Sequence, residues 1–102
     1  MNTHVINLKG MKPQVVPEGA VYIGKAWNLG RWKLPQSKWA NPYSVKKYGR
    51  DEAIRLFVPH LYSTGLIADV HELRGLVLAC WCSPLPCHGD ILAVLADMNP
   101  RR

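Results

Sequence analysis

The stretch LVLAC at residues 76–80 decides the fold of this 102-residue chain. It is a short, continuous apolar run, which is typical of a strand buried on both faces of a sheet. The segment CWCSPLPCHGD at residues 80–90 continues from it. Apolar residues at helical spacing then predict a final helix that contains Ile91, Leu92, Leu95 and Met98. A buried strand that leads into a helix indicates an α/β protein.

Other elements of the same kind precede this stretch. Short β-branched runs at residues 5–8 and 21–23 predict two further strands. Helical spacing of apolar residues predicts one helix that opens at Asp51 and a shorter one over residues 66–73. The order of these elements predicts a small, mainly parallel sheet covered by helices, in a single α/β domain that spans residues 1–102.

Pro59 interrupts the helical pattern that opens at Asp51. A proline inside a helix removes one backbone hydrogen bond and clashes with the carbonyl group four residues earlier, here that of Arg55. We therefore expect the helix to be kinked at this point or to end near Val58.

Residues 25–50 form a long basic, aromatic loop without helical or strand periodicity. They contain seven Lys and Arg side chains and no Asp or Glu, so the segment carries +7 against +6 for the whole chain. The segment also holds three tryptophans, which disordered chains seldom carry. Such a loop attracts anions: nucleic acid, a nucleotide or an acidic protein partner. The alternative interpretation is a solvated surface loop on a merely basic protein.

The composition indicates in which cellular compartment the protein is expected. No run reaches the roughly 18 apolar residues that a membrane span requires, and the first residues lack the charged and apolar parts of a signal peptide. Three cysteines crowded into residues 80–87 make a poor disulfide framework. We expect a cytoplasmic protein that does not enter a membrane.

The segment at residues 80–90 is the first candidate site, because open α/β sheets bind ligands outside the carboxyl ends of their strands. Cys87 and His88 stand where the last helix should begin. There, unpaired N–H groups and the helix dipole favour a thiolate or a bound anion. Asp90 is a candidate helix cap, or an acid that orients His88. Cys87, His88 and Asp90 are thus the candidate catalytic residues.

Three interpretations of the cysteines remain open. In the first, zinc is bound by Cys80, Cys82, Cys87 and His88, with Cys82, Cys87 and His88 as the candidate ligands that remain if Cys80 is a core residue, although the ligand spacing suits a tetrahedral ion poorly. In the second, Cys87 is a nucleophile whose base is His88, His60 or His71. In the third, the cysteines are small apolar side chains and the turn is one wall of a ligand pocket. No cofactor other than the zinc of the first interpretation is expected.

The stretch SKWANPY at residues 37–43 is the second candidate site. Trp39 can stack on a base, Lys38 can meet a phosphate, and the amide of Asn41 can read a base edge. These are the groups that a nucleotide or a single-stranded nucleic acid requires. The alternative is that Trp39 and Tyr43 only pin the long loop to the core.

Four motifs in order make the chain similar to a known family: VYIG at residues 21–24, SKWANPY, LRG at residues 73–75 and CWCSPLPCHGD. The sequence resembles a short domain of unknown function found in bacteria and their phages, over about residues 5–98. Lys25 stands where that family usually has Arg, and Tyr43 where it has Phe. The resemblance implies a cytosolic single-domain protein whose motif residues gather in one place; it supplies no function.

Our hypothesis is one pocket at the carboxyl edge of the sheet that binds a nucleotide or a nucleotide unit of nucleic acid. Lys25, Lys38 and the helix start at residues 88–90 would receive phosphate, with Trp39 and Trp81 as stacking walls. The full set of predicted ligand-binding residues is Lys25, Ser37, Lys38, Trp39, Asn41, Trp81, Cys82, His88 and Gly89. Two alternatives remain: a cysteine- and histidine-dependent enzyme on a nucleotide-like substrate, and a phage interaction protein that binds an acidic host partner.

Overall fold

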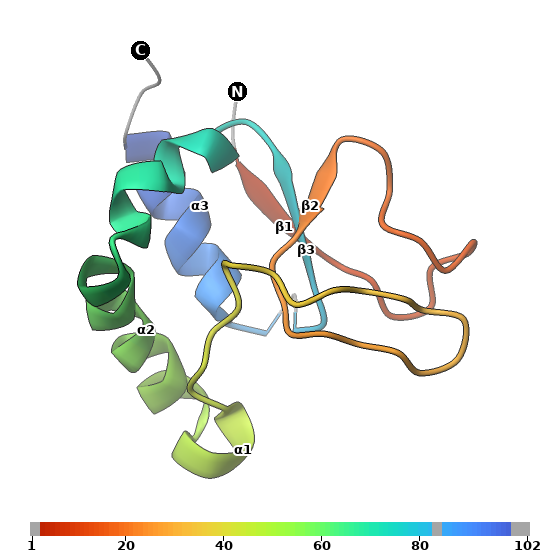
Figure 1. The fold of residues 1–102 in the computed structure, drawn as a ribbon, viewed down its shortest axis with the longest axis horizontal. Helices are drawn as coiled ribbons and strands as arrows, with labels where there is room; N and C mark the ends of the chain where they lie inside the picture. The colour runs from red at the N-terminus through yellow and green to blue at the C-terminus, as the bar shows by residue number, and fades with distance from the viewer. Residues whose placement is uncertain (1–2, 83–84, 99–102) are drawn as a thin grey trace.

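Three parallel strands form the centre of the computed structural model, which describes residues 3–82 and 85–98. Strands β1 (His4–Asn7), β2 (Ala20–Tyr22) and β3 (Val77–Cys80) lie in the order β1-β3-β2. Both neighbours of β3 run parallel to it (Figure 1). The predicted α/β fold with a small parallel sheet is confirmed.

The central position of β3 follows from its composition. His4 of β1 and Ala20 of β2 both pair with Val77, so the two outer strands start level with β3. The rest of β3, Leu78 to Cys80, is buried. A strand with a neighbour on each edge and packing on both faces exposes no backbone or side chain to water, and a continuous apolar run suits that place.

The helical segments of the described residues, four in all, lie together on one side of the sheet (Figure 1). They are α1 (Val45–Tyr48), α2 (Arg50–Thr64), the 3₁₀ helix η1 (Leu66–Leu73) and α3 (His88–Met98). Gly65 separates α2 from η1 with a φ of 81°, in the left-handed region that a glycine adopts without strain. None of the helices in the described part of the chain is long and apolar enough to cross a membrane.

Helix α2 continues through Pro59 to Thr64, so the predicted end near Val58 is wrong. Pro59 lies on the exposed side of the helix, where water can replace the missing hydrogen-bond donor. Phe57 and Leu61, one on each side of it in sequence, are both fully buried. Packing of these side chains therefore holds the helix together across the proline.

The loop at residues 25–50 contains more regular structure than its sequence predicts. Trp27 and Leu34 form an antiparallel bridge, with both N···O distances at 2.9 Å, so the chain folds back on itself there. Helix α1 begins after Ser44, whose side chain accepts a hydrogen bond from the backbone N–H of Lys47. Both elements are too short to produce a recognisable period.

The sheet has a different core on each face. On the helix side, Leu78 and Cys80 pack with Phe57, Leu61 and other buried side chains of the helices. On the opposite face, Ala79 packs under the loops, in a smaller cluster with Leu8, Trp32 and Leu34. The helices thus cover only one face, and the basic loop covers the other.

Candidate functional site

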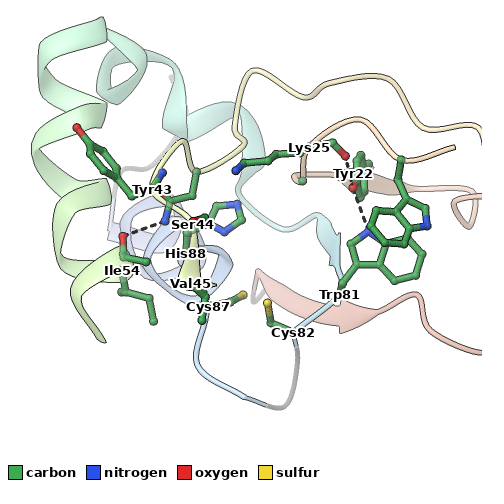
Figure 2. A pocket seen from close by; sticks show the side chains of 14 residues that line it. Tyr22, Lys25, Tyr43, Ser44, Val45, Ile54, Trp81, Cys82, Cys87 and His88 are labelled. Carbon is green, nitrogen blue, oxygen red and sulfur yellow. Dashed lines mark hydrogen bonds between the residues drawn. The ribbon is translucent and has the colours of Figure 1, made fainter. Parts of the chain in front are cut away.

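A pocket of about 270 Å³ lies beside the carboxyl ends of β2 and β3. Figure 2 shows side chains from the end of β2, the loop before α1, the start of α2, the turn after β3 and the start of α3 around it. Both sequence motifs and the end of β2 therefore contribute to one cavity. The lining residues are Tyr22, Gly24, Lys25, Trp27, Asn41, Tyr43, Ser44, Val45, Ala53, Ile54, Trp81, Cys82, Cys87 and His88.

One end of the pocket is fixed by a chain of hydrogen bonds (Figure 2). The indole N–H of Trp81 donates to the hydroxyl oxygen of Tyr22 at 3.0 Å, and that hydroxyl donates to the carbonyl oxygen of Lys25 at 2.5 Å. Burial raises the pKa of Tyr22, which keeps the hydroxyl protonated as a donor. A Cβ atom on Gly24 would lie 2.5 Å from the same hydroxyl oxygen, so this position accommodates only glycine without rearrangement.

Two tryptophan rings form an aromatic wall at this end. The ring centroids of Trp27 and Trp81 are 5.3 Å apart, with their planes at 40°. Trp32, which belongs to the core on the loop side of the sheet, packs edge-on against Trp81 with ring centroids 5.2 Å apart. Trp27 keeps 39% of its surface exposed, so one face of the wall is open to a ligand.

Asn41 lines the pocket but also holds the loop in place. Its side-chain amide donates to the carbonyl oxygen of Ala53 at 2.9 Å, and its side-chain oxygen accepts from the backbone N–H of Tyr43 at 3.0 Å. These bonds tie the loop to the start of α2. The amide retains a second hydrogen and a second lone pair with which to meet a ligand.

Four of the predicted ligand-binding residues lie outside the pocket: Gly89 at the start of α3, and Ser37, Lys38 and Trp39 of the SKWANPY stretch. Trp39 is 3% exposed and belongs to the core on the helix side. Lys38 forms ion pairs with Asp69 at 3.6 Å and Glu72 at 3.2 Å. The hydroxyl of Ser37 accepts a hydrogen bond from the backbone N–H of Trp39. The loop-pinning interpretation of Trp39 thus describes this structure better than the stacking one.

The start of α3 is capped by its own side chains. The sulfur of Cys87 accepts the backbone N–H of Gly89 at 3.3 Å, and the carboxylate of Asp90 accepts the backbone N–H of Cys87 at 3.0 Å. The bond from Cys87 to Asp90 is one half of a capping box, with Asp in the place of Glu, while the sulfur of Cys87 caps the N–H two residues on instead of three. A negative carboxylate already occupies the helix start, so the predicted phosphate does not fit there. Gly89 is buried in the packing of α3 against the sheet.

His88 joins α3 to the end of β2. Its Nε2 donates to the carbonyl oxygen of Ile23 at 2.8 Å, and its ring packs edge-on against Phe57 at 4.9 Å. Burial lowers the pKa of His88, while hydrogen bonds to the backbone of Ile23 and Trp39 act in the opposite direction. The imidazole is therefore mainly neutral at pH 7, and its contacts with Ile23 and Phe57 fix its position in the pocket wall.

The other two histidines named as possible bases lie elsewhere. His60 stacks on Phe57, with ring centroids 5.8 Å apart. The Nδ1 of His71 hydrogen-bonds the carbonyl oxygen of Ala68 at 3.0 Å. Neither histidine lines the pocket.

The thiol of Cys87 is protonated, although its position at the start of a helix predicts a thiolate. It is 3% exposed, and its sulfur lies 3.6 Å from the sulfur of Cys80. Hydrogen bonds with the thiols of Cys80 and Cys82, together with burial, raise the pKa of Cys87 well above its usual range. The predicted thiolate at Cys87 is therefore wrong, because these contacts outweigh the field of the helix.

Cys82, and not Cys87, is the thiol of this turn whose ionisation is favoured. Its side chain is half-buried and lines the pocket. A hydrogen bond from the thiol of Cys87, together with the guanidinium of Arg50, lowers the pKa of Cys82 to about 6 against the opposing effects of burial and the carboxylate of Asp90. A thiol with this pKa is mainly a thiolate at pH 7.

Arg50 is the residue that sequence reasoning missed. It stands at the start of α2, and its Nη1 donates to the carbonyl oxygen of Pro86 at 2.8 Å. Its guanidinium therefore links α2 to the turn before α3 and also hydrogen-bonds Cys82. Only its membership of the basic segment marks it in the sequence. Ser83 and Pro84 of the same turn lie outside the described residues.

The arrangement of the His, Cys, Asp and Glu side chains bears directly on the zinc interpretation. No group of three or more His, Cys, Asp or Glu side chains is arranged to hold a metal ion among residues 3–82 and 85–98. The contacts of Cys87 with Cys80 and Cys82, and of His88 with Ile23, are hydrogen bonds within the protein.

Comparison with known proteins gives one family and viral relatives. The model of the family described as "Domain of unknown function (DUF4326)" matches residues 6–98. An uncharacterized protein of Acanthamoeba polyphaga mimivirus is 34% identical over 100 residues, which cover 89% of this chain and 77% of that protein. An uncharacterized 12.4 kDa protein from the nrdA-td intergenic region of Enterobacteria phage T4 is 40% identical over 64 residues, 58% of this chain and 59% of that protein. No solved structure matches the chain.

These relatives bear on the resemblance drawn from the four motifs. A domain of unknown function and a phage relative are both confirmed. Occurrence in bacteria stays a prediction, since both relatives are viral.

Proposed function

The chain belongs to the DUF4326 family, and we propose that it binds a nucleotide, or a nucleotide unit of a nucleic acid, in the pocket beside β2 and β3. The observation that carries this proposal is the pairing of an open aromatic wall with a cation in one cavity that no described acidic residue lines. A base requires an apolar, flat surface, and a phosphate requires positive charge without a competing carboxylate.

The aromatic wall supports the base-binding half of the proposal. Trp81 is held from behind by Trp32 and by its hydrogen bond to Tyr22, so its ring needs no ordering when a ligand binds. Trp27 extends the wall to the surface. Stacking of one base on an aromatic side chain contributes about 1–3 kcal/mol.

Lys25 supports the phosphate-binding half. It is exposed and lines the pocket, and it takes part in none of the ion pairs found in the described part of the chain. Lys38, in contrast, is neutralised by two carboxylates. Lys25 therefore replaces Lys38 as the leading phosphate contact.

Replacement of Lys25 tests this assignment. We expect Lys25→Ala to weaken the binding of nucleoside monophosphates about tenfold, because a charge-assisted hydrogen bond to phosphate is lost. Isothermal titration calorimetry with a panel of nucleoside monophosphates at low salt measures the effect. Lys33→Ala is the matched control: it removes an exposed lysine of the same loop that does not line the pocket, and it should leave affinity unchanged. Equal losses in the two variants would show a diffuse charge effect and contradict the pocket.

Salt dependence separates a free nucleotide from a nucleic acid. Neutralisation of several phosphates by the basic loop makes the affinity for an oligonucleotide fall steeply with salt, whereas a mononucleotide has a shallow dependence. A protein that binds neither would overturn the proposal and favour an acidic protein partner for the basic loop. We also propose a cytoplasmic location, where both nucleotides and nucleic acids are present as ligands.

A second candidate function is a cysteine-dependent enzyme on a nucleotide-like substrate. The observation that favours it is the thiolate of Cys82 in the same pocket. The candidate nucleophile is thereby moved from Cys87 to Cys82, while His88, whose Nε2 already donates to Ile23, is a poor base. Consumption of a nucleotide by the wild type, lost in Cys82→Ser, would support this function.

A further inference from the structure

We propose that Cys82 and Cys87 form an oxidation site, in which a hydroperoxide oxidises Cys82 and Cys87 then closes an intramolecular disulfide. The site goes beyond ligand binding, and its chemistry does not require that the pocket hold a nucleotide.

The three cysteines form a connected set of thiols with one accessible member. Cys82 and Cys87 both line the pocket, and Figure 2 shows their sulfur atoms pointing into the same gap. Cys87 interacts with the thiol of Cys82 strongly enough to shift its pKa, and its sulfur lies 3.6 Å from the sulfur of Cys80. Cys80 and Cys87 are buried, and Cys82 is half-buried. A small oxidant that enters the pocket therefore meets Cys82 first.

Charge directs the reaction to the same thiol. Peroxides react with thiolates and not with thiols. Cys82 is the cysteine whose ionisation is favoured, by the hydrogen bond from Cys87 and by the guanidinium of Arg50. Cys87 keeps its proton. It is therefore not the first thiol to react, and we assign it the role of the resolving thiol that attacks oxidised Cys82.

The reaction balances in two steps. The thiolate of Cys82 attacks one peroxide oxygen; an S–O bond forms, the O–O bond breaks, and the departing oxygen takes a proton and leaves as water or an alcohol. Cys82 is then a sulfenic acid. The sulfur of Cys87 attacks the sulfur of Cys82, an S–S bond forms, and hydroxide leaves with the proton of Cys87 as water. Two thiols are oxidised by two electrons and one hydroperoxide is reduced.

The disulfide would also alter the start of α3. The sulfur of Cys87 is the acceptor that caps the N–H of Gly89. A bond to Cys82 turns this sulfur toward the β3 turn and removes the thiolate beside Arg50. Oxidation therefore changes the pocket wall, and reduction by a cytosolic thiol system restores it.

The test treats the reduced, full-length protein with hydrogen peroxide and measures free thiols, intact mass and disulfide-linked peptides. We expect the loss of two thiols per chain, a peptide pair joined through Cys82 and Cys87, and full reversal by a phosphine reductant. Cys82→Ser should lose thiols about tenfold more slowly or not at all. Cys87→Ser, which keeps a good helix-capping side chain, should accumulate a sulfenic acid on Cys82 that dimedone labels.

The remaining cysteine supplies the control. Cys80→Ala removes the buried neighbour of Cys87 but leaves the proposed pair intact, so it should form the same disulfide as the wild type. A bond between Cys80 and Cys87 in the wild type, a bond between two chains, or equal oxidation of Cys82→Ser would overturn the proposal. Failure of nucleotide binding would leave these results unchanged, so the two proposals fail separately.

Discussion

Phe57→Ala should destabilise the protein by about 3–5 kcal/mol, the largest effect that we expect from a single core substitution. Phe57 is fully buried on the inner side of α2. Its ring stacks on His60 and packs edge-on against His88. Removal of the ring leaves a cavity between α2 and α3 that their backbones cannot close. A domain of this size has only about 5–15 kcal/mol of stability in total, so a large part of it would be lost.

Urea unfolding followed by circular dichroism measures this loss. Tyr62→Ala is the matched control, because it removes a ring of similar size from the same helix where the side chain is 63% exposed; it should change stability by no more than about 0.5 kcal/mol. Phe57→Leu should fall between the two and keep the protein folded if Phe57→Ala does not fold. Equal stability of Phe57→Ala and Tyr62→Ala would contradict the packing of this core.

The main elements of the fold were predictable because each has a local signal. The apolar run of β3 indicates a buried strand whatever surrounds it, and α3 has its own helical period. Helix α2 was harder, because Pro59 carries a strong local signal that the packing of Phe57 and Leu61 overrides. The second core was not predictable: Trp32 and Leu34 are buried on the loop side, but isolated apolar residues among prolines and lysines show no period.

The location of the site was predictable from topology, since parallel strands bring their carboxyl ends to one edge. The assignment of individual side chains was less so. The partners of Lys38 lie more than thirty positions later in the chain, on η1, and nothing near Lys38 in the sequence indicates them. For Cys87, the helix start predicts an electric field that favours a thiolate. The structure adds two neighbouring thiols, which raise the pKa of Cys87, and the Asp90 carboxylate, which accepts the backbone N–H of Cys87. The tertiary contacts decide both cases.

The thiol of Cys82 should titrate with an apparent pKa of about 6, three units below the ordinary value of 9.0. Iodoacetamide should therefore alkylate Cys82 in the folded protein at pH 7, at least about tenfold faster than Cys80 or Cys87, which are buried and protonated. The rate should rise through pH 6 and level off below pH 8, and peptide mass spectrometry assigns the labelled site.

The same shift sets the sign of a stability effect. Because folding lowers the pKa of Cys82, ionisation of this thiol stabilises the folded state fully above pH 9, and the contribution is lost as the pH falls through about 6. The stability difference between the wild type and Cys82→Ser should therefore grow from pH 6 to pH 9.

Two variants separate the causes of this low pKa. Cys87→Ala removes the hydrogen bond that contributes most, and Arg50→Gln removes the guanidinium charge, so each should move the midpoint of the alkylation profile toward 9. The larger movement is expected in Cys87→Ala. Lys33→Ala, which changes net charge equally at a distance from the pocket, should leave the midpoint in place. A midpoint near 9 in the wild type would mean that Cys82 is an ordinary thiol; both the enzymatic candidate and the oxidation site would then lose their nucleophile, while nucleotide binding, which depends on Lys25 and the tryptophan wall, would stand.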